Sequence, residues 1–186
     1  MASITHATVA TGTDAGNGEI RKAEWNEDHV LVGVPYVFAH SAVAVSVSAV
    51  TTEEVLATIT IPAGAMGANG YVDVYTSFSA NNNANQKQMR IRVGGTGGNT
   101  FLNSSLASLV NNSRFTRVMN VNSVSSQKAL TQDGNSNGFG GAGGSAATAS
   151  VTTSSAWDLV ISGQKVVSAA DTLTLDSYTV LICYGA

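Results

Sequence analysis

Side chains capable of catalysis are few in this sequence, and their spacing does not bring them together. All three histidines lie within the first 40 residues, without a pair at metal-ligand spacing: His6, His29 and His40. Four aspartates are candidates for the carboxylate pair of a glycosidase or for a calcium site: Asp73, Asp158, Asp171 and Asp176. Each occupies an alternating strand pattern or the start of a strand, and no loop of the calcium-binding type surrounds them. We therefore expect no catalytic residue, no metal and no cofactor.

A glycine run from Arg92 to Thr100, RVGGTGGNT, has the composition of a phosphate-binding loop. No lysine follows at the position that such a loop requires, and no helix can be read after it to direct its N-terminus at a phosphate. We interpret the run as a glycine-rich turn between strands.

Aromatic and amide residues offer a different chemistry, because sugars stack on aromatic rings and hydrogen-bond to amides. Residues 133–150 form a glycine-rich stretch that is longer than compact domains usually keep without a use. The candidate receptor contacts lie in this stretch, just after it and in the asparagine-rich segment 81–85: Phe139, Trp157, Asn82 and Asn83. The alternative is that the stretch is an irregular surface loop and that Trp157 packs in the core or between subunits.

Sparse charge limits the classes of partner. Charged residues make up 11% of the chain, against about 25% in an average protein. The net charge of -3 argues against a nucleic-acid partner, which requires a basic stripe. No apolar run approaches the ~20 residues of a membrane span and the start lacks a signal-peptide pattern, so we expect a soluble protein made in the cytoplasm, without a membrane partner. Cys183, the single cysteine, is expected to be a buried thiol, with an interchain disulfide as the alternative.

Alternation of apolar and polar residues predicts strands from Pro35 to the end of the chain. The clearest segments are 43–47, 55–61, 72–78, 89–93 and 172–185. Val118 is out of phase with Phe115 and Met119, which predicts a bulge near 118–119. A second phase shift at Asp176-Ser177 predicts a bulge or a corner between sheets.

About eight to ten strands joined by glycine- and asparagine-rich turns predict an all-β fold, an antiparallel β-sandwich of the jelly-roll type. The open edges of such a sandwich must be covered, and the chain has few charged residues with which to protect them. We therefore expect packing against neighbouring subunits.

The stretch IRKAEWNEDHVLVG, residues 20–33, differs from this β body. Six of the chain's charged residues lie between Glu19 and Asp28, together with Trp25. One or two helical turns over residues 21–28 would be unstable alone, so the segment must dock on something. We predict a short extended, partly helical N-terminal arm at 1–34 and a β-sandwich domain at 35–186.

Glu24-Trp25-Asn26, His29, the apolar residues 30–32 and Gly33 resemble an element of tailed-bacteriophage virion appendages such as head fibres, decoration proteins and tail fibres. In those proteins the element reads Asp-Trp-Asn, two residues, His, an apolar pair and Gly. Here Glu replaces Asp and one residue is added before Gly, and Ile4-Thr5-His6 stands upstream as it does there. The resemblance covers about 30 residues, and the last strands, TLTLDSYTVLICYG, resemble those of phage jelly-roll tips more weakly.

This resemblance implies a virion component without enzyme activity. The arm would attach to other virion proteins of the capsid, portal or tail, and the jelly roll would project, commonly as a homotrimer. Trp25, Asn26 and His29 would be the attachment residues, at the particle or at the trimer axis. The alternative function is a receptor-binding tip that recognises a host-surface glycan. A third interpretation, an adhesive β-sandwich from a bacterium, lacks a secretion signal.

Overall fold

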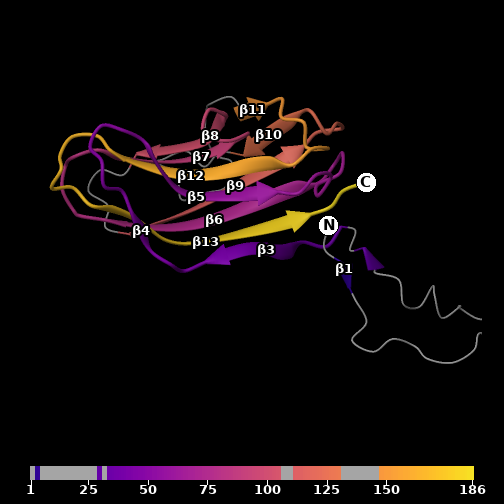
Figure 1. Cartoon of the computed structure of the whole chain (residues 1–186), viewed down its shortest axis with the longest axis horizontal. Helices are drawn as coiled ribbons and strands as arrows, with labels where there is room; N and C mark the ends of the chain where they lie inside the picture. Colours follow the sequence, from indigo (N-terminus) through magenta and orange to yellow (C-terminus); the bar gives the residue numbers. More distant parts are fainter. Residues whose placement is uncertain (1–2, 5–28, 31–32, 106–110, 131–146) are drawn as a thin grey trace, which may run out of the picture.

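The computed structural model describes residues 3–4, 29–30, 33–105, 111–130 and 147–186. All regular secondary structure in these ranges is β-strand, as the alternating sequence predicts. In chain order the strands are β1 (Ser3–Ile4), β2 (His29–Val30), β3 (Tyr36–Ser41), β4 (Val45–Ser46), β5 (Glu54–Ile61), β6 (Tyr71–Ala80), β7 (Lys87–Val93), β8 (Asn99–Ser105), β9 (Asn111–Asn120), β10 (Gln127–Leu130), β11 (Ala147–Ala149), β12 (Trp157–Lys165) and β13 (Leu173–Cys183). Figure 1 shows the long strands as two layers.

The main strands pair in a nested order: β3 with β13, β5 with β12, β6 with β9, and β7 with β8, all antiparallel. The chain is thus one long hairpin that folds over on itself, so that its nested strand pairs are distributed over two sheets. One has seven strands in the order β11-β10-β9-β6-β13-β3, with β4 also paired to β13, and the other has four, β5-β12-β7-β8. This arrangement is a jelly roll, and it confirms the predicted antiparallel β-sandwich.

Because the first and last of these strands pair, β3 begins at the end of the sandwich where the chain finishes (Figure 1). Gly33 N–H donates to Tyr184 O there at 3.0 Å. The loop between β6 and β7 and the loop between β12 and β13 lie at the opposite end, since Ala80 pairs with Leu173. We call this opposite end the far end.

One apolar core fills the space between the sheets. On β6, Val72, Val74 and Phe78 are at most 1% exposed and Thr76, in the same phase, is 3% exposed. Asp73, Tyr75 and Ser77 lie on the other side of the strand. The other large, fully buried apolar side chains come from both sheets and the loop before β6: Ile61, Met66, Met89, Ile91, Phe101, Leu102, Leu159, Ile161 and Leu173. Removing this apolar surface from water is the main term that favours folding.

The predicted strand over 43–47 is wrong in its extent, because only the two residues of β4 pair. Val43 is 75% exposed, whereas Val47 is buried. Beyond β4 the chain turns into the sandwich, where Val47 packs on Gly163 so closely that a Cβ added there would lie 2.7 Å from Val47 Cγ2. The burial of Val47 thus depends on a contact with Gly163, which is distant in the chain, and the local alternation of residues 43–47 does not reveal it.

The predicted bulge near 118–119 is also wrong. β9 pairs with β6 in unbroken register from Asn111 to Met119. Val118 points into the core, and Phe115 and Met119 point outward. The phase difference of Val118 is the ordinary alternation of a strand, in which neighbouring residues point to opposite sides.

The phase shift near Asp176 is a bulge. The register between β13 and β6 shifts between Leu175 and Ser177, as the sequence predicts. β13 continues beyond this point in the same sheet, so the shift is not a corner between sheets.

Candidate functional site

Several predicted site residues fall outside the described ranges: Trp25, Asn26 and Phe139. His29 lies in β2, and its partner in the antiparallel β1–β2 pair is Ile4. The backbone thus pairs Ser3–Ile4 with His29–Val30 within the N-terminal segment. The attachment role of Trp25, Asn26 and His29 stays a prediction.

The remaining receptor candidates differ in their exposure. Trp157 opens β12, is 5% exposed and belongs to the core cluster, in agreement with the packing alternative. Its ring therefore offers no open face to a ligand. Asn82 is exposed in the loop between β6 and β7 at the far end, whereas the amide of Asn83 is held by Lys87 and Asp171.

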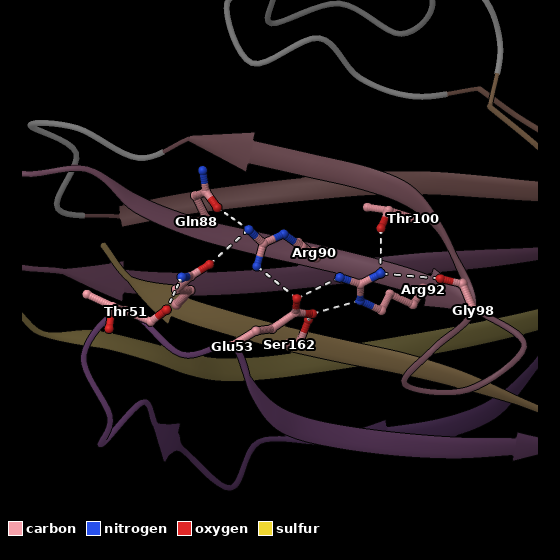
Figure 2. A network of polar contacts seen from close by, with 9 residues as sticks. Thr51, Glu53, Gln88, Arg90, Arg92, Gly98, Thr100 and Ser162 are labelled. Atoms are coloured by element: carbon pink, nitrogen blue, oxygen red, sulfur yellow. Dashed lines mark hydrogen bonds and ion pairs between the residues drawn. The ribbon is translucent and has the colours of Figure 1, made fainter. Parts of the chain in front are cut away.

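A network of polar side chains covers the outer side of the four-stranded sheet (Figure 2). We call it the polar face. Glu53, just before β5, accepts hydrogen bonds from Arg92 Nε at 2.7 Å and Nη2 at 2.6 Å. Arg90 Nη1 lies 3.0 Å from the same carboxylate, and Ser162 Oγ on β12 donates to it at 2.5 Å. One carboxylate therefore ties the segment before β5 to β7 and β12.

Arg90 Nη2 and Arg92 Nη1 also donate to protein acceptors. Arg90 Nη2 donates to Gln88 and, at 2.9 Å, to Gln164. Arg92 Nη1 donates to Thr100 Oγ1 at 2.7 Å and to Gly98 O at 3.2 Å (Figure 2). The polar face thus satisfies its charged groups internally, which suits a surface that needs no partner.

These hydrogen bonds and charges shift the pKa values of Glu53 and Arg92. Hydrogen bonding from Arg92, aided by Ser162 and the charge of Arg90 and opposed by partial burial, lowers the pKa of Glu53 from 4.5 to about 2. The same hydrogen bond raises the pKa of Arg92. Glu53 is therefore ionised near neutral pH, and an ionised carboxylate that accepts four hydrogen bonds from three side chains is a poor general acid.

The outer side of β6 and β9 is different, and we call it the aromatic face. Three successive directly opposed pairs form it: Tyr71 with Met119, Asp73 with Arg117, and Tyr75 with Phe115. The rings of Tyr75 and Phe115 have centroids 4.7 Å apart and are tilted by 45°. Cross-strand aromatic pairs of this kind stabilise a sheet and also present a rigid surface.

An ion pair lies between these rings. Arg117 donates from Nε to Asp73 Oδ1 at 2.6 Å and from Nη2 to Oδ2 at 2.7 Å. Its guanidinium also lies 3.9 Å from the ring centroid of Tyr71, at cation–π distance. The Asp73 side chain is only 6% exposed, against 31% for Arg117. Hydrogen bonding to Asp73 raises the pKa of Arg117, so its charge is permanent.

Part of the aromatic face is open to solvent. Tyr75 is 46% exposed, and Phe115 is partly so. The surface continues across β13, where Leu181 pairs with Asp73 on one side and with Val37 of the edge strand β3 on the other. Val37 is 61% exposed. Tyrosine, phenylalanine, methionine and arginine are the residues enriched in protein–protein interfaces, so this face has the composition of an interface.

Sequence reasoning missed the aromatic face. Both phases of β6 carry aromatic residues, with Phe78 inside and Tyr71 and Tyr75 outside. Period two shows which residues share a side of a strand, but it does not say which side is the core. The opposite charges of Asp73 and Arg117 indicate that these residues share one side of the sheet, but only once the register between β6 and β9 is known.

Comparison with known proteins adds little. Neither the family models nor the curated proteins include a match to this sequence. Among solved structures, the chain is similar to a chain in the structure of infectious bursal disease virus, Gx strain, over 95% of its own length. The sequence identity is 11% and the TM-score is 0.40, and only 36% of the viral chain is covered. This is a weak structural similarity to a viral protein.

The described residues were compared with the patterns of a metal site and of a membrane-spanning helix. They contain no group of three or more His, Cys, Asp or Glu side chains placed to hold a metal ion. No helix in that part of the chain is long and apolar enough to cross a membrane.

Proposed function

We propose that this chain is a non-enzymatic structural subunit of a bacteriophage virion, of the decoration, head-fibre or short-fibre kind. Residues 1–34 attach it to other virion proteins, and the jelly roll projects from the particle. The observation that carries the proposal is the aromatic face, a rigid surface of half-exposed rings, exposed Val37 and a pre-formed ion pair. Such a surface is suited to packing against another subunit.

The resemblance of the Trp25-Asn26-x-x-His29 element supplies the phage part of the proposal. A short charged segment with one tryptophan has no core of its own and needs a surface to dock on. The aromatic face supplies the assembly part, because the jelly roll keeps apolar area on its outside that a second copy would cover. We infer a homotrimer, with the aromatic faces directed at neighbouring copies.

The first test is the solution mass of the full chain and of residues 35–186, by light scattering after size exclusion. We expect three times the 19.0 kDa chain mass for both. A trimer that is lost when residues 1–34 are removed would make the arm the assembly element and would contradict the role of the aromatic face. Monomers from both at all concentrations would contradict a preformed spike.

Two matched variants sharpen this test. Tyr75 and Val55 are each 46% exposed, but they lie on the outer sides of different sheets. Tyr75→Glu places a charge in the aromatic face and should give folded monomers, because a buried unpaired charge opposes association. Val55→Glu should leave the trimer intact. Equal behaviour of the two variants would show that the aromatic face is not the interface.

Attachment is tested on particles. Trp25→Ala should lower the amount of this protein in purified virions, while the purified full-length variant keeps the circular dichroism and the unfolding midpoint of the wild type. A variant that unfolds the jelly roll would show that Trp25 belongs to the core of the sandwich. Absence of the wild-type protein from virions would refute the proposed function as a whole.

A second candidate function is a receptor-binding tip for a host-surface glycan. The position of Asn82 favours it, because this side chain is exposed at the far end, opposite to where the arm joins the sandwich. Deleting residues 135–145 or replacing Asn82 with Ala should then reduce cell adsorption and leave incorporation into particles unchanged. Adsorption equal to wild type in both variants would exclude this function.

A further inference from the structure

Lys87 is a fully buried lysine at the far end of the sandwich, with 0% of its surface exposed. Its Nζ donates to the backbone oxygen of Asn81 at 2.9 Å and to Oδ1 of Asn83 at 2.6 Å. Among the described residues no carboxylate lies within ion-pair distance of this ammonium group. A buried amine that is held against a side-chain amide is unusual, since lysines are almost never fully buried without a charged partner.

Asp171 fixes the amide from the other side. This carboxylate is 2% exposed and comes from the loop between β12 and β13. Its Oδ1 accepts from Asn83 Nδ2 at 2.7 Å and from Asn85 Nδ2 at 3.1 Å, and its Oδ2 accepts from Ser168 N at 3.2 Å. Lysine can only donate and a carboxylate can only accept, so the amide of Asn83 has one orientation, with its oxygen toward Lys87 and its nitrogen toward Asp171.

We propose that Lys87 and Asn83 form an intramolecular isopeptide bond, with Asp171 as the catalytic residue. The bond forms between Lys87 Nζ and Asn83 Cγ, and the bond between Cγ and Nδ2 breaks. Lys87 enters as an ammonium group and the leaving nitrogen departs as an ammonium ion, so charge and atoms balance without an oxidant or a co-reactant. Nζ gives up two protons and Nδ2 takes up two, and Asp171 relays them one at a time, directly or through a water molecule.

Three features of the site favour this step. The nucleophile and the amide are held together by the fold, which replaces an encounter in solution by an intramolecular reaction. Lys87 is buried and Asn83 is partly buried, which limits the access of water, the competing nucleophile, to the amide carbon. Asp171 is hydrogen-bonded to the leaving nitrogen, and hydrogen bonding from Asn83 and Asn85 lowers its pKa, so it begins as the carboxylate that can take up the proton.

The product would close a covalent ring across the loop between β6 and β7. It would also remove one positive charge from the chain, because the amine becomes an amide. Asp171 would then stay hydrogen-bonded to Asn85 and Ser168, so the loop between β12 and β13 would keep its anchor.

The test is the intact mass of the purified, folded full chain, before and after prolonged incubation at neutral pH. We expect the mass of the chain, corrected for removal of Met1, less one molecule of ammonia. Proteolysis with trypsin should no longer cleave after Lys87, and tandem mass spectrometry should assign the loss to the peptide that contains Asn83 and Lys87. An unchanged mass together with cleavage after Lys87 would overturn the proposal.

Matched variants separate this reaction from succinimide formation at an asparagine, which also releases ammonia. Lys87→Arg keeps the positive charge but lacks the primary amine, so it should keep the full mass. Asp171→Asn should slow the loss at least tenfold while Lys87 and Asn83 are both present. Loss of ammonia that persists in Lys87→Arg would assign it to succinimide and refute the cross-link. The outcome is independent of the proposed virion role, because it is measured on the isolated chain.

Discussion

The polar face and the aromatic face each place arginine against a carboxylate on the outside of a sheet. The two clusters differ in how many protein contacts their charged groups make and in how much of their surface stays exposed. On the polar face Glu53 is shared by Arg90 and Arg92, and the remaining guanidinium donors meet side-chain or backbone oxygens. On the aromatic face the single pair Asp73–Arg117 lies among rings that stay partly exposed. The polar cluster therefore joins elements of its own sheet, whereas the aromatic cluster leaves ring surface exposed.

The two sheets also differ in how the few charged residues of the chain are distributed over their outer sides. With 11% charged residues the molecule has little charge to distribute. It concentrates two of its arginines on the four-stranded sheet, where they shield buried Val160 and Ser162 on the outer side of β12. The seven-stranded sheet keeps apolar side chains outside, as interface cores do.

The largest effect should come from breaking the pair within the aromatic face. Asp73→Asn leaves Arg117 without its counter-charge among the rings, which should lower the free energy of unfolding by about 3 kcal/mol. Urea unfolding of the full chain followed by circular dichroism measures this. The double variant Asp73→Asn with Arg117→Met removes both charges and should recover more than half of the loss. A double variant as unstable as Asp73→Asn alone would show that the ion pair is not the cause.

A smaller effect is expected on the polar face. Glu53→Gln removes the charge shared by Arg90 and Arg92, but these groups keep some contact with water, so the free energy of unfolding should fall by about 1–2 kcal/mol. Glu54→Gln is the matched control, since the neighbouring Glu54 accepts from Ser48 and contacts neither arginine. Equal losses in the two variants would mean that the shared carboxylate has no special role.

The pH dependence should give a still smaller, graded effect. The pKa of Glu53 is lowered from 4.5 to about 2, so its stabilising contribution is complete above pH 4.5 and is lost as the pH falls toward 2. The pKa values of Glu54 and Asp171 are lowered as well, and the whole protein should therefore lose stability in acid. The difference in unfolding midpoint between wild type and Glu53→Gln isolates Glu53, and it should shrink between pH 4.5 and 2. A constant difference over that range would contradict the lowered pKa.

The sequence predicted the fold well because strand alternation and turn composition are local signals. β13 shows this, since both its alternation and the shift near Asp176 could be read from adjacent residues. β4 shows the limit, because the burial of Val47 depends on Gly163, which is far away in the chain.

The candidate sites were less predictable for the same reason. Asp171 and Asn83 are distant in sequence, and only the meeting of two loops at the far end brings them into contact. Glu53 reaches β7 only because β12 lies between β5 and β7 in the sheet. Strand alternation does not say which side of β6 or β9 is the core, and Tyr75 and Phe115 point away from it. Trp157 was the one candidate for which packing in the core was weighed beside ligand contact.

The pairing of β3 with β13 has a mechanical consequence. β3 runs antiparallel to the last strand from the pair Tyr36–Ile182 to the pair Ser41–Tyr178, and Gly33 adds a further hydrogen bond to Tyr184. Tension applied to residues 1–34 along the axis of β3 would load these hydrogen bonds together, in shear, instead of opening them one at a time. In a subunit held by its N-terminal segment and pulled from the far end, the hydrogen bonds between β3 and β13, its longest strand, would therefore bear the force.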